Sequence, residues 1–236
     1  MNKDKVLLLL AAQGDPKKAA EIESYLHEDK AAPDEAQQRD SESVRRFLEP
    51  DGLYLVFTDG THVAYEPGKV TEAVKQACTG LAVKMGDKAL TLGLFNLQNG
   101  DDLTLTCEDS PKDYDPAAYK DTYEDAGADW DGKANTERML AAGILNENIS
   151  DCLLPGQYVP AMGEMLFIHL FRKQINQALR ELDGQEISGW YWTSTEFSAT
   201  YAWYLSLDNG YMTYSPKAAY ALRVRPVSAF IPAFNL

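Results

Sequence analysis

The chain has few cysteines and few histidines. An odd number of cysteines at wide spacings fits neither a zinc site nor a disulfide framework, and free, buried thiols are the expected state. The three cysteines are Cys78, Cys107 and Cys152, and the three histidines are His27, His62 and His169. We therefore predict no metal centre and no cofactor built on these residues.

Catalytic motifs are also missing. The chain contains no G-x-S-x-G, no H-E-x-x-H, no Gly-rich phosphate loop and no C-x-x-C. His169 lies in an apolar stretch, where we expect a half-buried, hydrogen-bonded imidazole rather than a base. Glu164 and Glu196 have the chemistry of paired catalytic carboxylates, but nothing in the sequence brings them together. We expect both to accept hydrogen bonds from backbone amides, and the protein not to be an enzyme.

Basic clusters and long apolar runs are lacking as well. The formal net charge of −14 repels phosphate and anionic lipid, so nucleic acid is not an expected partner. No segment approaches the roughly 18 apolar residues that span a bilayer, so we expect no membrane insertion. The short apolar run 6–12 lacks a convincing cleavage site, and no signal peptide is expected. Localisation stays open: cytoplasmic synthesis is compatible with display on a phage particle or a surface.

The chain changes character near Pro50. Asp15-Pro16 and Pro33 are typical helix starts, so residues 1–50 are predicted to be a helical N-terminal segment. From residue 51 onward, short period-two runs separated by glycine-containing turns predict strands. These runs lie at 53–57, 61–65, 81–85, 89–97 and 103–107. We predict a second domain over residues 51–236.

An acidic stretch follows these strands. Residues 101–131 carry eleven acidic side chains against two lysines, which is typical of a solvated loop. Within 125–135, an EF-hand register centred on Gly132 places Gly127 and Arg138 where carboxylates are required. A different calcium loop and a hydrated surface both stay open. Helices are then predicted at 135–147 and 161–182, which makes the fold class α+β with mixed, mostly antiparallel sheets.

The final stretch, residues 190–230, carries alternating polar and apolar side chains. A two-residue type I′ turn at Asn209-Gly210 places Trp203, Leu205 and Leu207 on an inward face. The outward face then receives Tyr204, Ser206, Asp208, Tyr211, Thr213 and Ser215. Such Tyr- and Ser-rich surfaces are used by antibody combining sites. An ordinary solvated hairpin fits the pattern equally well.

An ordered series of motifs separates these alternatives. The series is DWDGKANTE at 129–137, VPAMGEM at 159–165, YWTSTE at 191–196, Asn209-Gly210, Lys217 and VRPVSAF at 224–230. It resembles a bacterial and phage group of C-type-lectin-like domains, and within it the variable proteins of diversity-generating retroelements. The resemblance covers about residues 125–230, and it implies a C-type-lectin-like fold with two helices over 51–236.

The resemblance also implies a division of the residues into framework and contact positions. The framework would be Trp192, Ser194, Glu196, Ala202, Trp203, Leu205, Leu207, Gly210, Lys217, Val224, Arg225 and Val227. The diversified, ligand-binding positions would be Tyr201, Tyr204, Ser206, Asp208, Tyr211, Thr213, Tyr214, Ser215 and Tyr220. Tyr214 conflicts with the hairpin register, which turns it inward. Sugar-binding E-P-N and Q-P-D tripeptides are absent, and no cysteine follows Cys152, unlike in the sulfatase-modifying enzymes of this broad fold.

These observations predict a non-enzymatic protein that binds a protein or glycan ligand through a variable surface. The alternative is a structural or adhesin component, such as a tail or surface fibre, that uses the same face to contact a sister subunit. A homo-oligomer is compatible with either function. Calcium-dependent carbohydrate binding is a third hypothesis.

Overall fold

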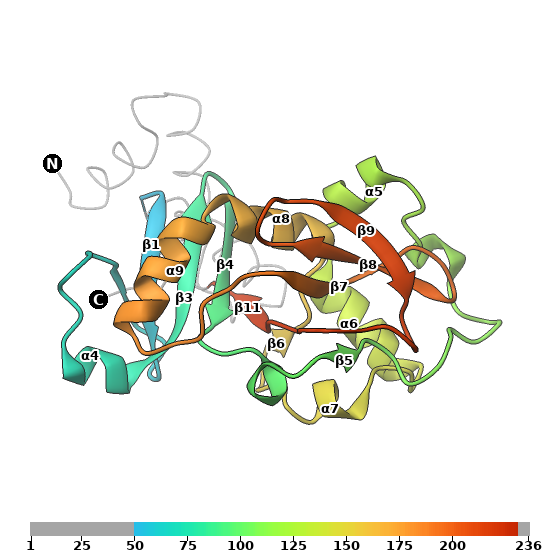
Figure 1. Cartoon of the computed structure of the whole chain (residues 1–236), viewed down its shortest axis with the longest axis horizontal. Coiled ribbons are helices and arrows are strands. Elements are labelled where there is room, and N and C mark those ends of the chain that lie inside the picture. The colour runs from blue at the N-terminus through green and yellow to red at the C-terminus, as the bar shows by residue number, and fades with distance from the viewer. Residues whose placement is uncertain (1–49, 231–236) are drawn as a thin grey trace, which may run out of the picture.

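The first four strands predicted after residue 51 lie in one large antiparallel sheet, whereas the fifth, at 103–107, does not belong to it. The computed structural model describes residues 50–230, so the predicted helical segment lies outside the described residues except for Pro50. The sheet has the order β2-β1-β3-β4-β11-β6 (Figure 1). Its strands are β1 (Gly52–Phe57), β2 (His62–Ala64), β3 (Cys78–Met85), β4 (Lys88–Gly93), β6 (Gln157–Tyr158) and β11 (Val227–Ala229). The α+β class with antiparallel sheets is confirmed.

The C-terminal stretch forms a separate three-stranded sheet. Its order is β7 (Trp190–Glu196), β8 (Tyr201–Ser206) and β9 (Met212–Pro216). A small two-stranded sheet joins β5 (Leu103–Thr104) to β10 (Ala221–Leu222). The chain then returns to the large sheet through β11, which pairs with β4 and β6.

The described residues contain six α-helices, where the sequence predicted two. They are α4 (Glu72–Ala77), α5 (Tyr123–Ala128), α6 (Gly132–Ala141), α7 (Glu147–Ser150), α8 (Met162–Leu170) and α9 (Arg172–Glu181). The single helix predicted at 161–182 is wrong, because Phe171 takes φ −101° and ψ 7° and separates α8 from α9. None of the helices described is long and apolar enough to cross a membrane.

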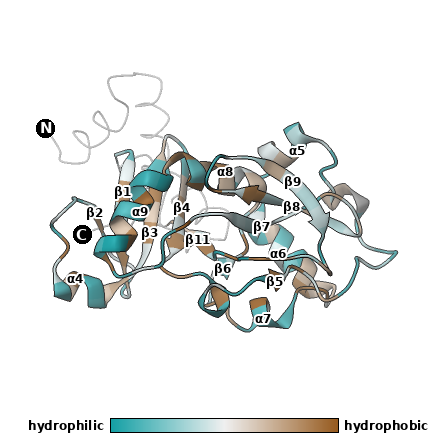
Figure 2. Ribbon diagram, in the orientation of Figure 1, coloured by the Kyte–Doolittle hydropathy of each residue, from teal (hydrophilic) through white to brown (hydrophobic). Residues whose placement is uncertain are grey.

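Two apolar cores enclose the three-stranded sheet. Because side chains alternate along a strand, Trp203 and Leu205 face a core shared with α8, α9 and the large sheet. Trp192 and Ala202 face a second core built mainly from residues 97–159. Figure 2 shows the hydrophilic turns of α9 interrupted by hydrophobic positions, in keeping with its buried Ile175, Ala178 and Leu179. The sheet is therefore fixed from both sides.

The acidic stretch is more ordered than predicted. Most of its carboxylates are exposed, but Tyr114, Ala118 and Ala126 are buried and part of the stretch forms α5. Asp129 is buried too, and its carboxylate accepts hydrogen bonds from Asn135 Nδ2 at 2.8 Å and from Thr195 Oγ1 at 2.7 Å. The prediction of a solvated surface therefore holds for ten of the eleven acidic side chains, but the segment is not a plain loop, since sparse apolar residues anchor it and part of it is helical. Within residues 50–230, no cluster of three or more His, Cys, Asp or Glu side chains forms a candidate metal site.

The cysteines are all free, but their environments differ from the prediction. Cys78 is buried in β3, whereas Cys107 is exposed and Cys152 is partly exposed. Burial raises the pKa of the Cys78 thiol. The expectation of buried thiols therefore holds for Cys78 alone.

Glu164 lies in the first turn of α8 and is only 5% exposed. It accepts hydrogen bonds from the Ala161 N–H at 2.7 Å and from the Tyr158 hydroxyl at 2.8 Å. The predicted backbone-anchoring role is confirmed for this residue. Burial raises the pKa of Glu164 from 4.5 to about 7. The negative charges of Asp129 and Asp131 also raise this pKa, whereas the hydrogen bonds from Ala161 and Tyr158 lower it.

This raised pKa predicts a loss of stability as the pH rises. The folded state keeps the Glu164 proton up to about pH 7, whereas the unfolded chain releases it near pH 4.5. The contribution of Glu164 to the free energy of unfolding is therefore greatest below pH 4.5. It falls by roughly 3 kcal/mol in total between pH 4.5 and pH 7. Glu164→Gln, which resembles the protonated carboxyl, should lack this fall in urea unfolding measured from pH 5 to 8. The exposed Glu137→Gln should behave as wild type, and parallel pH profiles for all three proteins would refute the assignment.

Candidate functional site: an exposed aromatic face

The β8–β9 hairpin has a longer turn than the sequence predicted. Leu205 pairs with Met212 and Tyr204 with Thr213, so the register is shifted by two residues from the predicted one. The two-residue type I′ turn is wrong because Asn209 does not adopt a positive φ; its side chain instead accepts the Tyr211 N–H at 3.0 Å. Gly210 alone in this turn takes a positive φ, of 75°. A shift of two residues leaves every side chain on its predicted face.

The nine predicted contact residues divide between two faces and the turn. Five lie on the side of the second core: Tyr204, Ser206, Tyr211, Thr213 and Ser215. Tyr220 joins them through ring contacts, although Ser206 is itself buried. Asp208 lies in the turn. Tyr201 and Tyr214 occupy the opposite face with Trp203, so the hairpin reasoning placed Tyr214 on the correct face.

Four rings form one continuous surface, which we call the aromatic patch: Trp190, Tyr204, Tyr211 and Tyr220. The Trp190 ring lies 5.3 Å from that of Tyr204 and 6.1 Å from that of Tyr211. The ring centroids of Tyr204 and Tyr220 are 5.8 Å apart. Trp190, Tyr211 and Tyr220 are 38%, 56% and 45% exposed. Trp190 was missed, although it stands two residues before Trp192 and strand alternation gives both the same face.

Trp192 forms the buried floor of the patch. Its ring contacts those of Tyr204 and Tyr220, at 5.6 and 6.3 Å. Its Nε1 donates to the Leu103 carbonyl at 2.9 Å. The position of the exposed rings is therefore tied to the second core.

The opposite face carries a second group of rings, which we call the opposite cluster: Tyr123, Phe197, Tyr201 and Tyr214. Phe197 and Tyr214 are stacked at 3.9 Å, and Tyr201 meets Tyr214 edge-on at 5.9 Å. The rings of Tyr123, Phe197 and Tyr214 contact that of Trp203, whose Nε1 donates to the Lys120 carbonyl at 2.7 Å. The hairpin thus has exposed rings on both of its faces.

A buried ion pair supports this region. Lys217 and Glu196 have side chains that are 0% and 1% exposed, and Lys217 Nζ donates to Glu196 Oε1. Lys217 Nζ also donates to Ser110 Oγ at 2.6 Å, and the Tyr114 hydroxyl donates to Glu196 Oε2 at 2.6 Å. Burial and this carboxylate raise the pKa of Tyr114. The predicted role of Glu196 is wrong, because its carboxylate binds these side chains and not backbone amides.

Arg225 is a second buried cation of the predicted framework. It donates from Nη1 to Asn96 Oδ1 at 3.1 Å and from Nη2 to the Gln185 carbonyl at 2.9 Å. Burial lowers its pKa to about 10, so it keeps its charge at neutral pH. It connects the start of the last strand to two loops and does not reach the aromatic patch. His169 is half-buried with Nδ1 2.9 Å from the Leu207 carbonyl oxygen, as predicted.

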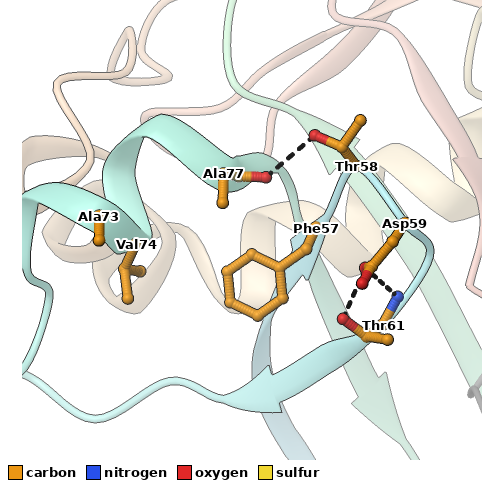
Figure 3. Close-up of a pocket in the computed structure, with 7 residues that line it drawn as sticks. All are labelled: Phe57, Thr58, Asp59, Thr61, Ala73, Val74 and Ala77. Atoms are coloured by element: carbon orange, nitrogen blue, oxygen red, sulfur yellow. Dashed lines mark hydrogen bonds between the residues drawn. The ribbon is translucent and has the colours of Figure 1, made fainter.

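A shallow hollow of about 470 Å³ lies elsewhere, between α4 and the β1–β2 turn (Figure 3). Its walls include Phe57, Val74 and Ala77. The Thr58 and Thr61 hydroxyls are already bonded, to the Ala77 carbonyl at 3.2 Å and to Asp59 at 2.6 Å. None of its seven lining residues belongs to the predicted contact set, and its polar groups do not converge on a ligand.

Comparison with known proteins agrees with the α+β architecture. No family model matches the chain, and no curated protein matches its sequence. A solved structure of a fimbrial protein from Bacteroides ovatus ATCC 8483 is similar, with a TM-score of 0.55 and 16% identity. The similarity covers 77% of this chain and 49% of that protein, so the chain spans about half of its length. At this identity the likeness shows a shared fold alone.

The ion pair predicts a large effect of removing one partner. Lys217→Ala leaves the Glu196 carboxylate buried without a cation, which should cost about 3–5 kcal/mol of unfolding free energy. Replacing both residues with apolar side chains of similar volume, as Lys217→Met with Glu196→Leu, should restore part of the loss, since it removes both charges but leaves the Tyr114 and Ser110 hydroxyls without these partners. The exposed pair Arg180–Glu186 is the control, since Arg180→Ala should cost less than about 1 kcal/mol. Denaturant unfolding measures all three, and equal losses for Lys217→Ala and Arg180→Ala would contradict the prediction.

Proposed function

We propose that the protein is a non-enzymatic binding protein whose aromatic patch contacts a protein or glycan ligand. The observation that carries the proposal is the continuity of Trp190, Tyr204, Tyr211 and Tyr220 on one exposed surface. Trp and Tyr supply most of the binding energy in protein interfaces because they bury large areas at small entropic cost.

The charges around the patch support the same proposal. Residues 197–222 contain one acidic and one basic side chain in a chain of net charge −14. Both are already paired: Asp208 with Arg172 at 2.5 Å, and Lys217 with Glu196. The part of the patch that lies in this segment, Tyr204, Tyr211 and Tyr220, therefore offers neutral rings and hydroxyls, and its ligand need not carry a charge opposite to that of the protein.

We further propose that the scaffold is a C-type-lectin-like domain related to retroelement-diversified variable proteins. The burial of the framework positions supports this, since Trp192, Trp203, Lys217 and Arg225 have no exposed surface. Tyr211 and Tyr220, proposed as diversified, are largely exposed. Sequencing the genomic neighbourhood tests this point. A reverse transcriptase and a template repeat that differs from codons 195–230 mainly at adenines are expected, and their absence would reject the diversification.

The second candidate function is a structural or adhesin component of a surface fibre. The observation that favours it is the similarity to a fimbrial protein. The same aromatic patch would then contact a receptor or a sister subunit. The two candidates share a non-enzymatic role and differ in the identity of the partner.

Removing exposed rings should abolish binding while leaving the fold intact. Glycan arrays and protein arrays would first identify a binding probe. With that probe, Tyr211→Ala combined with Tyr220→Ala should weaken binding by at least about 30-fold in Kd, because two such interface residues contribute about 1–2 kcal/mol or more each. The melting temperature should change little, since both side chains are exposed.

Matched variants on the other face are the control. Tyr201→Ala and Tyr214→Ala should retain binding, because these rings belong to the opposite cluster. Trp203→Ala should cost about 3–5 kcal/mol of stability as a core truncation. Loss of binding in the opposite-cluster variants with retention in the patch variants would reverse the assignment.

A further inference from the structure

Among the described residues, the backbone groups along the outer edge of β9 have no strand partner. The Ser206 N–H donates to the Tyr211 carbonyl at 2.9 Å, and the Lys217 N–H donates to the Thr200 carbonyl at 3.0 Å. These two bonds fix the phase of the antiparallel ladder, in which alternate residues bond to β8. Met212 and Tyr214 therefore direct their N–H and C=O groups away from β8.

This edge lacks the usual protection. β9 is the last strand in its sheet, and within residues 50–230 no further strand pairs with its outer side. The strand Met212–Pro216 carries no charged side chain and has no buried residue. Natural proteins normally guard such edges with lysines, bulges or a covering element. Only Pro216, at the end of the strand, limits pairing.

We propose that β9 pairs antiparallel with β9 of a second copy of the chain. In the register that fits best, Met212 lies opposite Tyr214 of the second copy, and Thr213 lies opposite its own equivalent on the two-fold axis. Met212 of each copy then exchanges two backbone N–H···O=C bonds with Tyr214 of the other copy, which gives four hydrogen bonds. A register centred on Tyr214 is worse, because it places Pro216, which has no N–H, opposite Met212.

The side chains suit this pairing. Met212 and Tyr214 lie on the same face of the strand, so each thioether meets the tyrosine ring of the other copy, a favourable contact. The charge of the hairpin also favours this contact. Two copies of a chain with net charge −14 repel each other, but the hairpin can meet its equivalent without this repulsion, because its one acid, Asp208, is bound by Arg172.

Pairing has a consequence for ligand binding. The two-fold axis of antiparallel pairing is perpendicular to the sheet, so both aromatic patches lie on the same side of a continuous six-stranded sheet. This consequence rests on the proposed function, whereas the pairing does not. A multivalent ligand would gain avidity from two patches, by about 10²–10⁴-fold where both engage at once. Because each copy contributes a five-residue strand, the interface is small and the dimer should be weak and concentration-dependent.

Sedimentation of the full chain over a concentration series tests the pairing. The wild type should move from monomer to dimer as concentration rises. Met212→Pro should remain monomeric, because it removes an outward-facing N–H that β8 does not use. Tyr220→Ala removes a patch ring that contacts Trp192 and Tyr204 on β7 and β8, so this variant should dimerise as the wild type does. A wild type that is monomeric at every concentration up to about 1 mM overturns the inference. The inference is equally overturned if such a monomer pairs only with extended peptides from other proteins.

A cross-linking variant keeps the test independent of the proline variant's folding. With Cys107→Ser and Cys152→Ser as background, Thr213→Cys should form a symmetric disulfide dimer on mild oxidation, since directly opposite residues in such a pair suit disulfide geometry. Tyr220→Cys in the same background should not. Equal cross-linking of both, or of neither, overturns the pairing. A monomer that still binds ligand through the patch leaves the proposed function standing, and a dimer without any patch ligand leaves the pairing standing.

Discussion

The ion pair between Glu196 and Lys217 connects three segments that are far apart in the sequence. Glu196 ends β7, Lys217 follows β9, and the hydroxyls of Ser110 and Tyr114 bring the acidic stretch to the same point. Two buried charges are costly unless their remaining hydrogen-bonding capacity is used, and the two hydroxyls each take up part of it here. The pair therefore fixes where the chain goes after the hairpin, and with it the position of Tyr220.

The three-stranded sheet gains its rigidity from both of its faces. Trp192 and Trp203 point to opposite cores, and each donates its indole N–H to a backbone carbonyl, that of Leu103 in β5 and that of Lys120 in a loop respectively. Such bonds let an indole be fully buried without an unsatisfied donor. The exposed rings rest on these two indoles, so the patch is placed by residues that do not themselves reach solvent.

The sequence predicted what depends on local periodicity. Strand alternation located β1 and β3, and it assigned the faces of Tyr204 and Tyr214 correctly even though the turn was wrong, because a slip of two residues preserves the faces. Long-range relations could not be read in this way. The contact between Tyr220 and Tyr204 joins β8 to the segment that follows the buried Lys217, and the order in the acidic stretch depends on a few apolar anchors among many carboxylates. The break at Phe171 interrupts an apolar pattern that continues unchanged through it.

The hairpin separates what holds it together from what it displays. Thr213 and Ser215 bond to β8 through their backbone, so the ladder is maintained whatever side chains stand there, provided they are not proline. Trp203 and Leu205 supply the apolar contacts from β8 and are fully buried. Side chains such as Tyr211 can then change at little cost to stability, which is the property that a diversified binding surface requires. The same backbone runs along the unprotected outer edge of β9, where the proposed pairing would give a dimer with two aromatic patches. This pairing uses backbone N–H and C=O groups of Met212 and Tyr214, which neither the core nor the patch needs.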